Sequence, residues 1–284
     1  MKTKHIVIDF GGTSTKILII ADSDIIERHC LESRHYPTTK EGISQLFSEL
    51  RISKKDASTL IVTGGKSRRL QHVLNGLNVI IVNEIEAIGV GGLQACGETS
   101  SVVVSIGTGT AIVVARKTSR TSTGYTVQHV GGLALGGGTI MGLGKLLCNI
   151  STFHELSQLA DTGQSNKVDL TVGDIVGGSI GIIPAELTAV NFGRADREGF
   201  EYSDADIASG LFTMVGQSIA RLASVIARQH EIEPITVIGQ VIENHYMQRV
   251  FNEVKELFGG RFRFAEHARY RVAEGAYELA KGQL

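Results

Sequence analysis

The chain has 284 residues, of which 42% are hydrophobic, and its formal net charge is −1. This length suits two domains, and the near-neutral charge favours neither nucleic acid nor a membrane as a partner. Three widely spaced cysteines, Cys30, Cys96 and Cys148, indicate neither a disulfide framework nor a zinc site. The first residues lead into an apolar strand without a signal segment, and no apolar run approaches membrane-spanning length, which predicts a cytoplasmic protein.

The N-terminal part is predicted to begin with a strand meander and to continue with alternating helices and strands. Apolar, β-branched runs predict strands, and the spacing of apolar residues predicts an amphipathic helix. The expected elements are strands at 6–9, 15–20 and 25–31, a helix at 42–50, strands at 59–63 and 79–82, and a helix of small residues that ends near residue 96.

The C-terminal part repeats this order with longer insertions. The expected elements are a hairpin at 101–116, a strand at 125–130, a glycine-rich segment at 131–144, two helical stretches, a loop region around 162–200, a helix at 203–230, a strand at 235–239, a helix at 243–258, a strand at 262–265 and a helix at 271–281. The repeated order predicts two related lobes, at residues 1–98 and 99–284.

Two hairpin turns rich in glycine and threonine resemble each other. The first holds Gly11, Gly12, Thr13 and, on its second strand, Lys16; the second holds Gly107, Thr108, Gly109 and Thr110. Glycine has no Cβ, so backbone N–H groups in such a turn can approach phosphate oxygens closely. Two such turns predict a pair of phosphate clamps that face each other across a cleft, as in a kinase or ATPase built from two related lobes.

Asp9 stands at the end of the first buried strand, directly before the first turn. A carboxylate there is unfavourable unless it meets a cation or several hydrogen-bond donors. We interpret Asp9 as a Mg²⁺ anchor that acts through water, with a turn-capping aspartate as the alternative. Lys16 is either part of this site or a solvated strand lysine.

The densest glycine run is Gly136-Gly137-Gly138, directly before a predicted helix. Free N–H groups at a helix N-terminus favour an anion, so the run predicts a third phosphate-binding element. The alternative is close helix packing, which suits Gly142 and Gly144 better than the triple run. The spacing excludes a P-loop.

Glu84 and Glu86 follow the predicted strand at 79–82. A carboxylate at the mouth of the cleft can accept a proton from a substrate hydroxyl, but acids also stabilise helix N-termini. The pattern alone favours the second interpretation. The basic stretch at 66–69 is interpreted as a solvated helix start.

Taken together, these motifs resemble those of the type II pantothenate kinases, within the actin/Hsp70/sugar-kinase ATPase superfamily. The resemblance implies an α/β, two-lobed actin-like ATPase fold made of duplicated ribonuclease H-like domains, with mixed sheets flanked by helices. The matching segments are 9–16, 63–65, 84–87, 107–110, 130–144, 169–175, 183–189, 191–193 and 237–239, in family order along almost the whole chain.

The resemblance implies ATP-dependent phosphorylation of pantothenate to 4′-phosphopantothenate, with Mg²⁺ as the metal. It also implies a homodimer to which the helix at 203–230 contributes. The implied catalytic residues are Glu84, as general base, and Asp9, at Mg²⁺. The nucleotide would contact Gly11, Gly12, Thr13, Lys16, Gly107, Thr108, Gly136, Gly137, Gly138 and Gly239, and the acceptor would contact Thr108, Thr110 and His129.

Two positions depart from the family pattern. The family usually has arginine where this chain has His129, and often has serine where this chain has Ala111. Arginine carries a permanent charge, whereas imidazole is mostly uncharged at neutral pH. Both departures bear on the acceptor, so three alternatives stay open: pantetheine as acceptor, a sugar as acceptor, or an ATP-binding regulator without catalysis.

Overall fold

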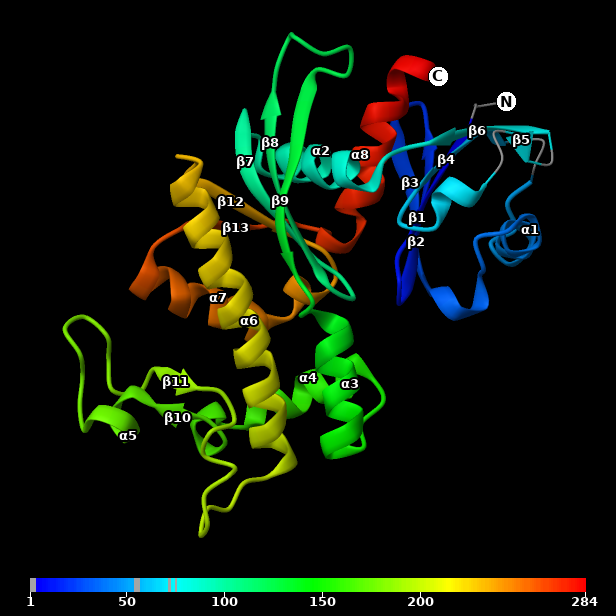
Figure 1. Cartoon of the computed structure of the whole chain (residues 1–284). Coiled ribbons are helices and arrows are strands. Elements are labelled where there is room, and N and C mark those ends of the chain that lie inside the picture. Colours follow the sequence, from blue (N-terminus) through cyan, green and yellow to red (C-terminus); the bar gives the residue numbers. More distant parts are fainter. Residues whose placement is uncertain (1–3, 54–56, 71–72, 75) are drawn as a thin grey trace.

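The computed structural model describes residues 4–53, 57–70, 73–74 and 76–284, and its strands form two large mixed sheets and one two-stranded sheet (Figure 1). The first sheet contains β1 (Lys4–Phe10), β2 (Ser14–Ala21), β3 (Asp24–Glu32), β4 (Ala57–Thr63), β5 (Val73–Leu74) and β6 (Leu77–Ile81). The second contains β7 (Ser100–Ile106), β8 (Thr110–Lys117), β9 (Tyr125–Leu133), β12 (Pro234–Ile238) and β13 (Arg261–Phe264).

Helices cover the sheets and the space between them. They are α1 (Lys40–Glu49), α2 (Glu84–Cys96), α3 (Gly137–Cys148), α4 (Phe153–Thr162), α5 (Val172–Val176), α6 (Asp204–Gln229), α7 (His245–Phe258) and α8 (Arg271–Ala280). The predicted strands and helices are confirmed, with ends shifted by a few residues. Within the region that was predicted as a loop, β10 (Leu170–Thr171), α5 and β11 (Thr188–Val190) form a small arm beside α6 (Figure 1).

The two large sheets repeat one strand order, which confirms the predicted internal duplication. The first runs β3-β2-β1-β4-β6-β5 and the second runs β9-β8-β7-β12-β13, so the first five strands of one match the five strands of the other. In each, three strands form an antiparallel meander and two more are added in parallel. The first hairpin turn (11–13) and the second hairpin turn (107–109) therefore occupy the same position in their own sheets.

A glycine after the first added parallel strand is also repeated. Gly64 follows β4 with a φ of +98°, and Gly239 follows β12 with a φ of +100°. A Cβ on Gly64 would lie 2.4 Å from the carbonyl oxygen of Phe10, and a Cβ on Gly239 would lie 2.4 Å from that of Ile106. Only glycine fits such a close approach in this conformation, so each chain turn is held against the end of a hairpin strand.

Helices α2 and α8 cross each other between the two sheets (Figure 1). Glycines allow the close crossing: a Cβ on Gly91 would lie 1.9 Å from the carbonyl oxygen of Arg271, and one on Gly275 would lie 2.1 Å from that of Ala87. The central hydrophobic cluster contains residues of both sheets and of both helices. We propose a division into two lobes at residues 1–98 and 99–284. Helix α8 belongs to the second lobe by sequence but packs against β1 and β4 of the first.

Helix α6 carries much of the core of the second lobe. Apolar residues at helical spacing along one of its faces are buried, namely Leu211, Val215, Ile219 and Ile226, and Leu222 on the same face is partly exposed. The prediction that no apolar run approaches membrane-spanning length was wrong for α6. Among the described helices, α6 is long and apolar enough to cross a membrane, judged by length and composition only. Because 72% of its apolar window is buried inside the fold, α6 has the character of a core helix.

The helix crossing makes a testable prediction about two helical glycines. Gly91→Ala places a methyl group against a backbone carbonyl, so we expect the free energy of unfolding to fall by about 1–3 kcal/mol or more. Gly142→Ala, in α3, has no heavy atom within 4 Å of the new Cβ and should raise it by about 0.5–1 kcal/mol. Urea unfolding of both variants measures the difference, and equal stability of the two would contradict the crossing.

Candidate active site

A cavity of about 390 Å³ lies where the two hairpin turns meet. Residues from both sheets, α2, α3, α4 and α8 line it. It gathers all but two of the residues that the sequence places in the site: Asp9, Gly11, Gly12, Thr13, Lys16, Glu84, Gly107, Thr108, Thr110, Gly137, Gly138 and Gly239. Gly136 and His129 do not line it.

The two hairpin turns touch each other. The hydroxyl groups of Thr13 and Thr108 share a hydrogen bond of 2.9 Å between their Oγ1 atoms. A Cβ on Gly12 would lie 2.9 Å from Oγ1 of Thr108, so a larger residue at this position would displace the Thr108 side chain. Ser14 adds a second link between the sheets, because its hydroxyl donates to Oε1 of Gln240 at 3.0 Å. The expected face-to-face arrangement is therefore present, and the phosphate-clamp role stays a prediction.

Asp9 and Lys16 stand opposite each other in the antiparallel pair of β1 and β2. The Asp9 side chain is nearly buried, and its Oδ2 lies 4.0 Å from Nζ of Lys16. Nζ also donates to the carbonyl oxygen of Ser14 at 3.2 Å. Burial raises the pKa of the Asp9 carboxyl group, and the Lys16 charge opposes that rise.

Glu84 is the first residue of α2, which Asn83 caps by accepting a hydrogen bond from the N–H of Ile85 at 2.9 Å. The cap fixes the start of the helix and so places Glu84 at the cavity. Burial raises the pKa of the Glu84 carboxyl group, the charge of Asp9 raises it further, and the charge of Lys16 lowers it. The cavity thus contains two electrostatically coupled carboxyl groups with one ammonium group beside them.

The carboxylate oxygen atoms in the cavity fit a magnesium ion, which takes oxygen ligands and keeps much of its water. Asp9 is a buried acid whose charge Lys16 compensates only from 4.0 Å. Thr63, its neighbour across β1 and β4, is fully buried, and its Oγ1 has no hydrogen-bond partner. Within the described ranges no three His, Cys, Asp or Glu side chains gather, so water and phosphate would supply the remaining ligands.

The triple glycine run corrects one expectation. The N–H groups of Gly137 and Gly138 are not free, because they donate to the carbonyl oxygens of Gly107 at 2.8 Å and of Thr108 at 2.9 Å. A Cβ on Gly136 or Gly138 would lie less than 3.0 Å from the backbone of the second turn. The run therefore packs the start of α3 against that turn. The sequence analysis gave close packing to Gly142 and Gly144 instead. Gly144 is closely packed, since a Cβ there would lie 2.4 Å from the Leu156 side chain, whereas Gly142 stands in open space.

His129 and Thr110 differ in their surroundings. His129 is exposed on β9, on the same face as Val127, whose side chain lies against Gly89 of α2. Thr110 lines the cavity, but its hydroxyl donates to the carbonyl oxygen of Leu135 at 2.8 Å. Thr110 thus holds the short connection between β9 and α3, and any contact with an acceptor would use its remaining lone pairs.

Several cavity residues were missed by sequence reasoning, among them Ser14, Gln240, Arg269, Met141 and Phe153. Arg269 is held by Glu243, which accepts from its N–H at 3.0 Å and from its Nε at 2.5 Å. The internal duplication could have indicated Arg269. Strand β13 corresponds to β6 in the repeated sheets, and Arg269 comes after β13 as Glu84 comes after β6.

Two repeated sheets with facing turns at a shared cavity define a class of protein. Solved structures with the same architecture include the activator of 2-hydroxyisocaproyl-CoA dehydratase from Clostridium difficile with bound ADPNP (TM-score 0.63, 15% identity, 100% of this chain and 96% of that one). Another is a ROK family glucokinase from Streptomyces griseus in complex with glucose and AMPPNP (TM-score 0.59, 14% identity, 98% and 99%). The chain has the two-lobed, actin-like ATPase fold, as the sequence predicts.

Sequence comparison narrows this class. The Fumble family model matches residues 96–257. The type II pantothenate kinase from Bacillus cereus strain G9842 is 33% identical over 268 residues, which cover 89% of this chain and 90% of that protein. The one from Bacillus cereus strain ATCC 10987 is 32% identical over 254 residues, which cover 86% of each. One from Staphylococcus saprophyticus is 29% identical and covers 96% of this chain and 98% of its own. The chain belongs to the type II pantothenate kinase family.

The electrostatics of the cavity make a prediction about Lys16. The Lys16 charge lowers the pKa of Asp9 and of Glu84, so Lys16→Met should raise the pKa of the Glu84 carboxyl group. Titration of the Glu84 side-chain carbon by ¹³C NMR measures it. Lys117→Met, an exposed lysine at the far end of β8, serves as the control and should leave that pKa unchanged. An unshifted Glu84 titration in Lys16→Met would contradict the coupling.

Proposed function

We propose that this protein uses ATP to phosphorylate pantothenate to 4′-phosphopantothenate, the first step of coenzyme A biosynthesis. Membership of the family supports this assignment, because its curated relatives are named type II pantothenate kinase. The structural observation that supports it most strongly is the contact between the two hairpin turns. It brings Gly12, Thr13 and Thr108 into one cavity with Asp9 and Glu84.

In this proposal the two turns bind the phosphates of ATP from opposite walls of the cavity. The Thr13 and Thr108 hydroxyls, which bond to each other here, turn to the phosphates as donors. Lys16 lies beside them and adds positive charge. Asp9 holds Mg²⁺ through water, and the metal, when bound, neutralises charge on the phosphates.

Glu84 acts as the general base. As the primary hydroxyl oxygen of pantothenate forms its bond to the γ-phosphorus, the bond from that phosphorus to the β–γ bridging oxygen breaks and ADP leaves with the electron pair. The Glu84 carboxylate takes the hydroxyl proton. Its raised pKa makes its carboxylate a better proton acceptor than that of an ordinary glutamate. Positioning and charge stabilisation supply the rest of the acceleration.

The surface of the chain is consistent with the homodimer that we also propose. Large apolar side chains are exposed on the arm and on α3, including Ile182 at 83% and Leu146 at 79%. Scattered apolar residues are normal on a surface, but a gathering on one projecting segment is typical of an interface. Helix α6 would contribute through its few exposed residues, such as Val225. We further propose that the enzyme acts in the cytoplasm.

Glu84→Gln tests the general base. The amide cannot accept the proton, so we expect kcat to fall roughly a hundredfold or more while the affinity for MgATP stays nearly the same. ADP release with pantothenate as acceptor measures kcat, and calorimetry measures nucleotide affinity. Glu86→Gln is the matched control, because Glu86 lies in the same first turn of α2 but is exposed and outside the cavity.

The pH dependence sharpens this test. A base with a raised pKa is protonated in acid, so kcat of the native enzyme should fall as the pH drops through the raised pKa of Glu84 and level off above it. The Glu84→Gln variant should lack that limb. If Glu84→Gln kept the native kcat, Glu84 would not be the general base. The proposal that the two turns bind ATP would still stand.

His129→Arg tests the acceptor. Pantothenate is a carboxylate, and arginine keeps its charge at neutral pH whereas histidine mostly does not. We therefore expect His129→Arg to lower the KM for pantothenate about tenfold, which corresponds to about 1.4 kcal/mol, and to leave the KM for ATP unchanged. Initial rates with each substrate varied measure this. A change in the KM for ATP alone would place His129 at the nucleotide instead.

A further inference from the structure

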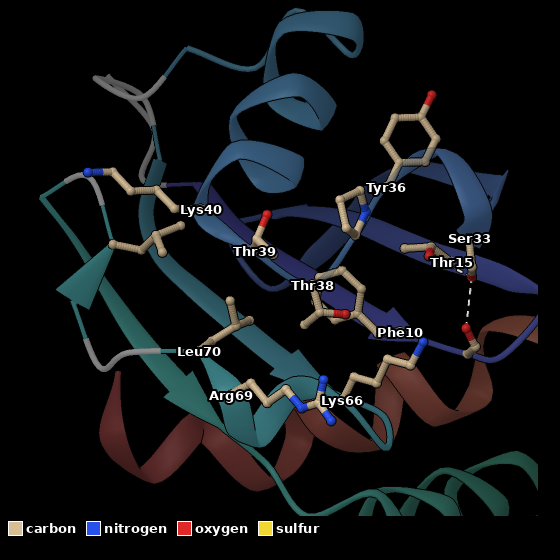
Figure 2. Close-up of a pocket in the computed structure, with 13 residues that line it drawn as sticks. Phe10, Thr15, Ser33, Tyr36, Thr38, Thr39, Lys40, Lys66, Arg69 and Leu70 are labelled. Atoms are coloured by element: carbon tan, nitrogen blue, oxygen red, sulfur yellow. Dashed lines mark hydrogen bonds between the residues drawn. The ribbon is translucent and has the colours of Figure 1, made fainter.

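A second cavity, of about 550 Å³, lies beside the first hairpin turn (Figure 2). Gly11 lines both cavities, so the turn forms a wall between them. The second cavity belongs to the first lobe alone, and nothing in the proposed reaction uses it. Its described lining contains three cationic side chains, Lys40, Lys66 and Arg69, and no acidic one.

Lys66 and Arg69 lie next to each other at one edge of the second cavity, with the Lys66 amino group extending towards Ser33 (Figure 2). They stand three residues apart at a 3₁₀ turn, where such side chains eclipse each other. Within the described part of the chain neither forms an ion pair or a side-chain hydrogen bond. Two neighbouring cations without a counter-charge repel each other, and an anion between them would remove the repulsion.

The turn that presents these two cations is fixed. The backbone N–H of Ser67 donates to the carbonyl oxygen of Gly64 at 3.0 Å, and its buried hydroxyl donates to the same oxygen at 2.7 Å. Gly64 is in turn held against Phe10 at the end of β1. Lys66 and Arg69 are therefore attached to a preorganised backbone, which reduces the entropy lost when they bind a ligand.

The rest of the second cavity combines an apolar floor with hydroxyl groups. Phe10, Leu70 and Leu74 are buried side chains of the floor. Ser33 and Thr15 line the wall beside the turn; the Ser33 hydroxyl donates to the carbonyl oxygen of Gly11 at 2.8 Å and lies 2.9 Å from Oγ1 of Thr15. The lining thus offers cations at one edge and apolar surface across its floor.

We propose that this second cavity is a binding site for a small organic phosphate, separate from the nucleotide site. Its phosphate group lies between Lys66 and Arg69, and its apolar part covers Phe10 and Leu70. Both parts of the cavity are needed to select such a ligand. Inorganic phosphate would contact only the two cations, and an uncharged aromatic compound would contact only the apolar floor. The site does not depend on the proposed kinase reaction.

Phenyl phosphate is the probe for the experiment, with the full chain and isothermal titration calorimetry. We expect one site for phenyl phosphate, weaker binding of inorganic phosphate and no measurable binding of phenol. Binding should persist when MgADPNP fills the nucleotide site. Displacement of phenyl phosphate by MgADPNP would overturn the proposal, because the probe would then occupy the active site.

Variants locate the site. The double variant Lys66→Ala/Arg69→Ala removes two charged hydrogen bonds, so its affinity for phenyl phosphate should fall at least tenfold, roughly the effect of losing one such bond. Arg68→Ala, from the same turn but outside the cavity lining, removes one positive charge and should bind like the native chain. Native affinity in the double variant, or an equal loss in Arg68→Ala, would overturn the proposal. All three exchanged side chains are exposed, and thermal unfolding checks that each variant is folded.

Discussion

The contact between Gly12, Thr13 and Thr108 is the constraint on which the rest of the structure depends. It joins two turns that are 95 residues apart in the chain, and it exists only because each turn occupies the same place in its own copy of a repeated sheet. The Thr108 side chain reaches the first turn because Gly12 has no Cβ, which would lie 2.9 Å from Oγ1 of Thr108. The crossing of α2 and α8, tightened by Gly91 and Gly275, supports the spacing of the sheets behind it.

The same geometry places unfavourable charge in the site. Asp9 is buried and Glu84 is half-buried, and the charge of Asp9 raises the pKa of Glu84, with Lys16 as partial compensation for both. A fold selected for stability alone would gain nothing from two coupled carboxyl groups at this depth. A phosphoryl-transfer site needs one acid to hold the hydrated metal and another to accept a proton, so the unfavourable charge and the chemistry have one origin.

Much of the fold was predictable because strands and helices depend on local patterns. The hairpins, the parallel strands with their glycines and the α6 face follow from apolar periodicity and turn residues. The site was predictable where duplication repeats a motif, as at Gly12 and Thr108. The role of Gly136–Gly138 was not, since a glycine run is compatible with a bound anion or with a close backbone, and only the tertiary neighbour decides. The cavity beside Lys66 was missed for the same reason, because Phe10, far away in sequence, forms its floor.

Three segments that match the family pattern, 169–175, 183–189 and 191–193, lie in the arm, away from the cavity. Asp169 is fully buried in the arm and accepts hydrogen bonds from the Thr188 hydroxyl at 3.1 Å, the Asn191 amide at 3.4 Å and the Phe192 N–H at 2.8 Å. Three donors at one buried carboxylate give the arm an internal framework although it has little apolar core. The framework holds Ile182 and its apolar neighbours outward, in contact with water. An arm that is rigid inside and apolar outside is suited to packing against another surface. In the function that we propose, the arm therefore serves assembly and the two hairpin turns serve the chemistry.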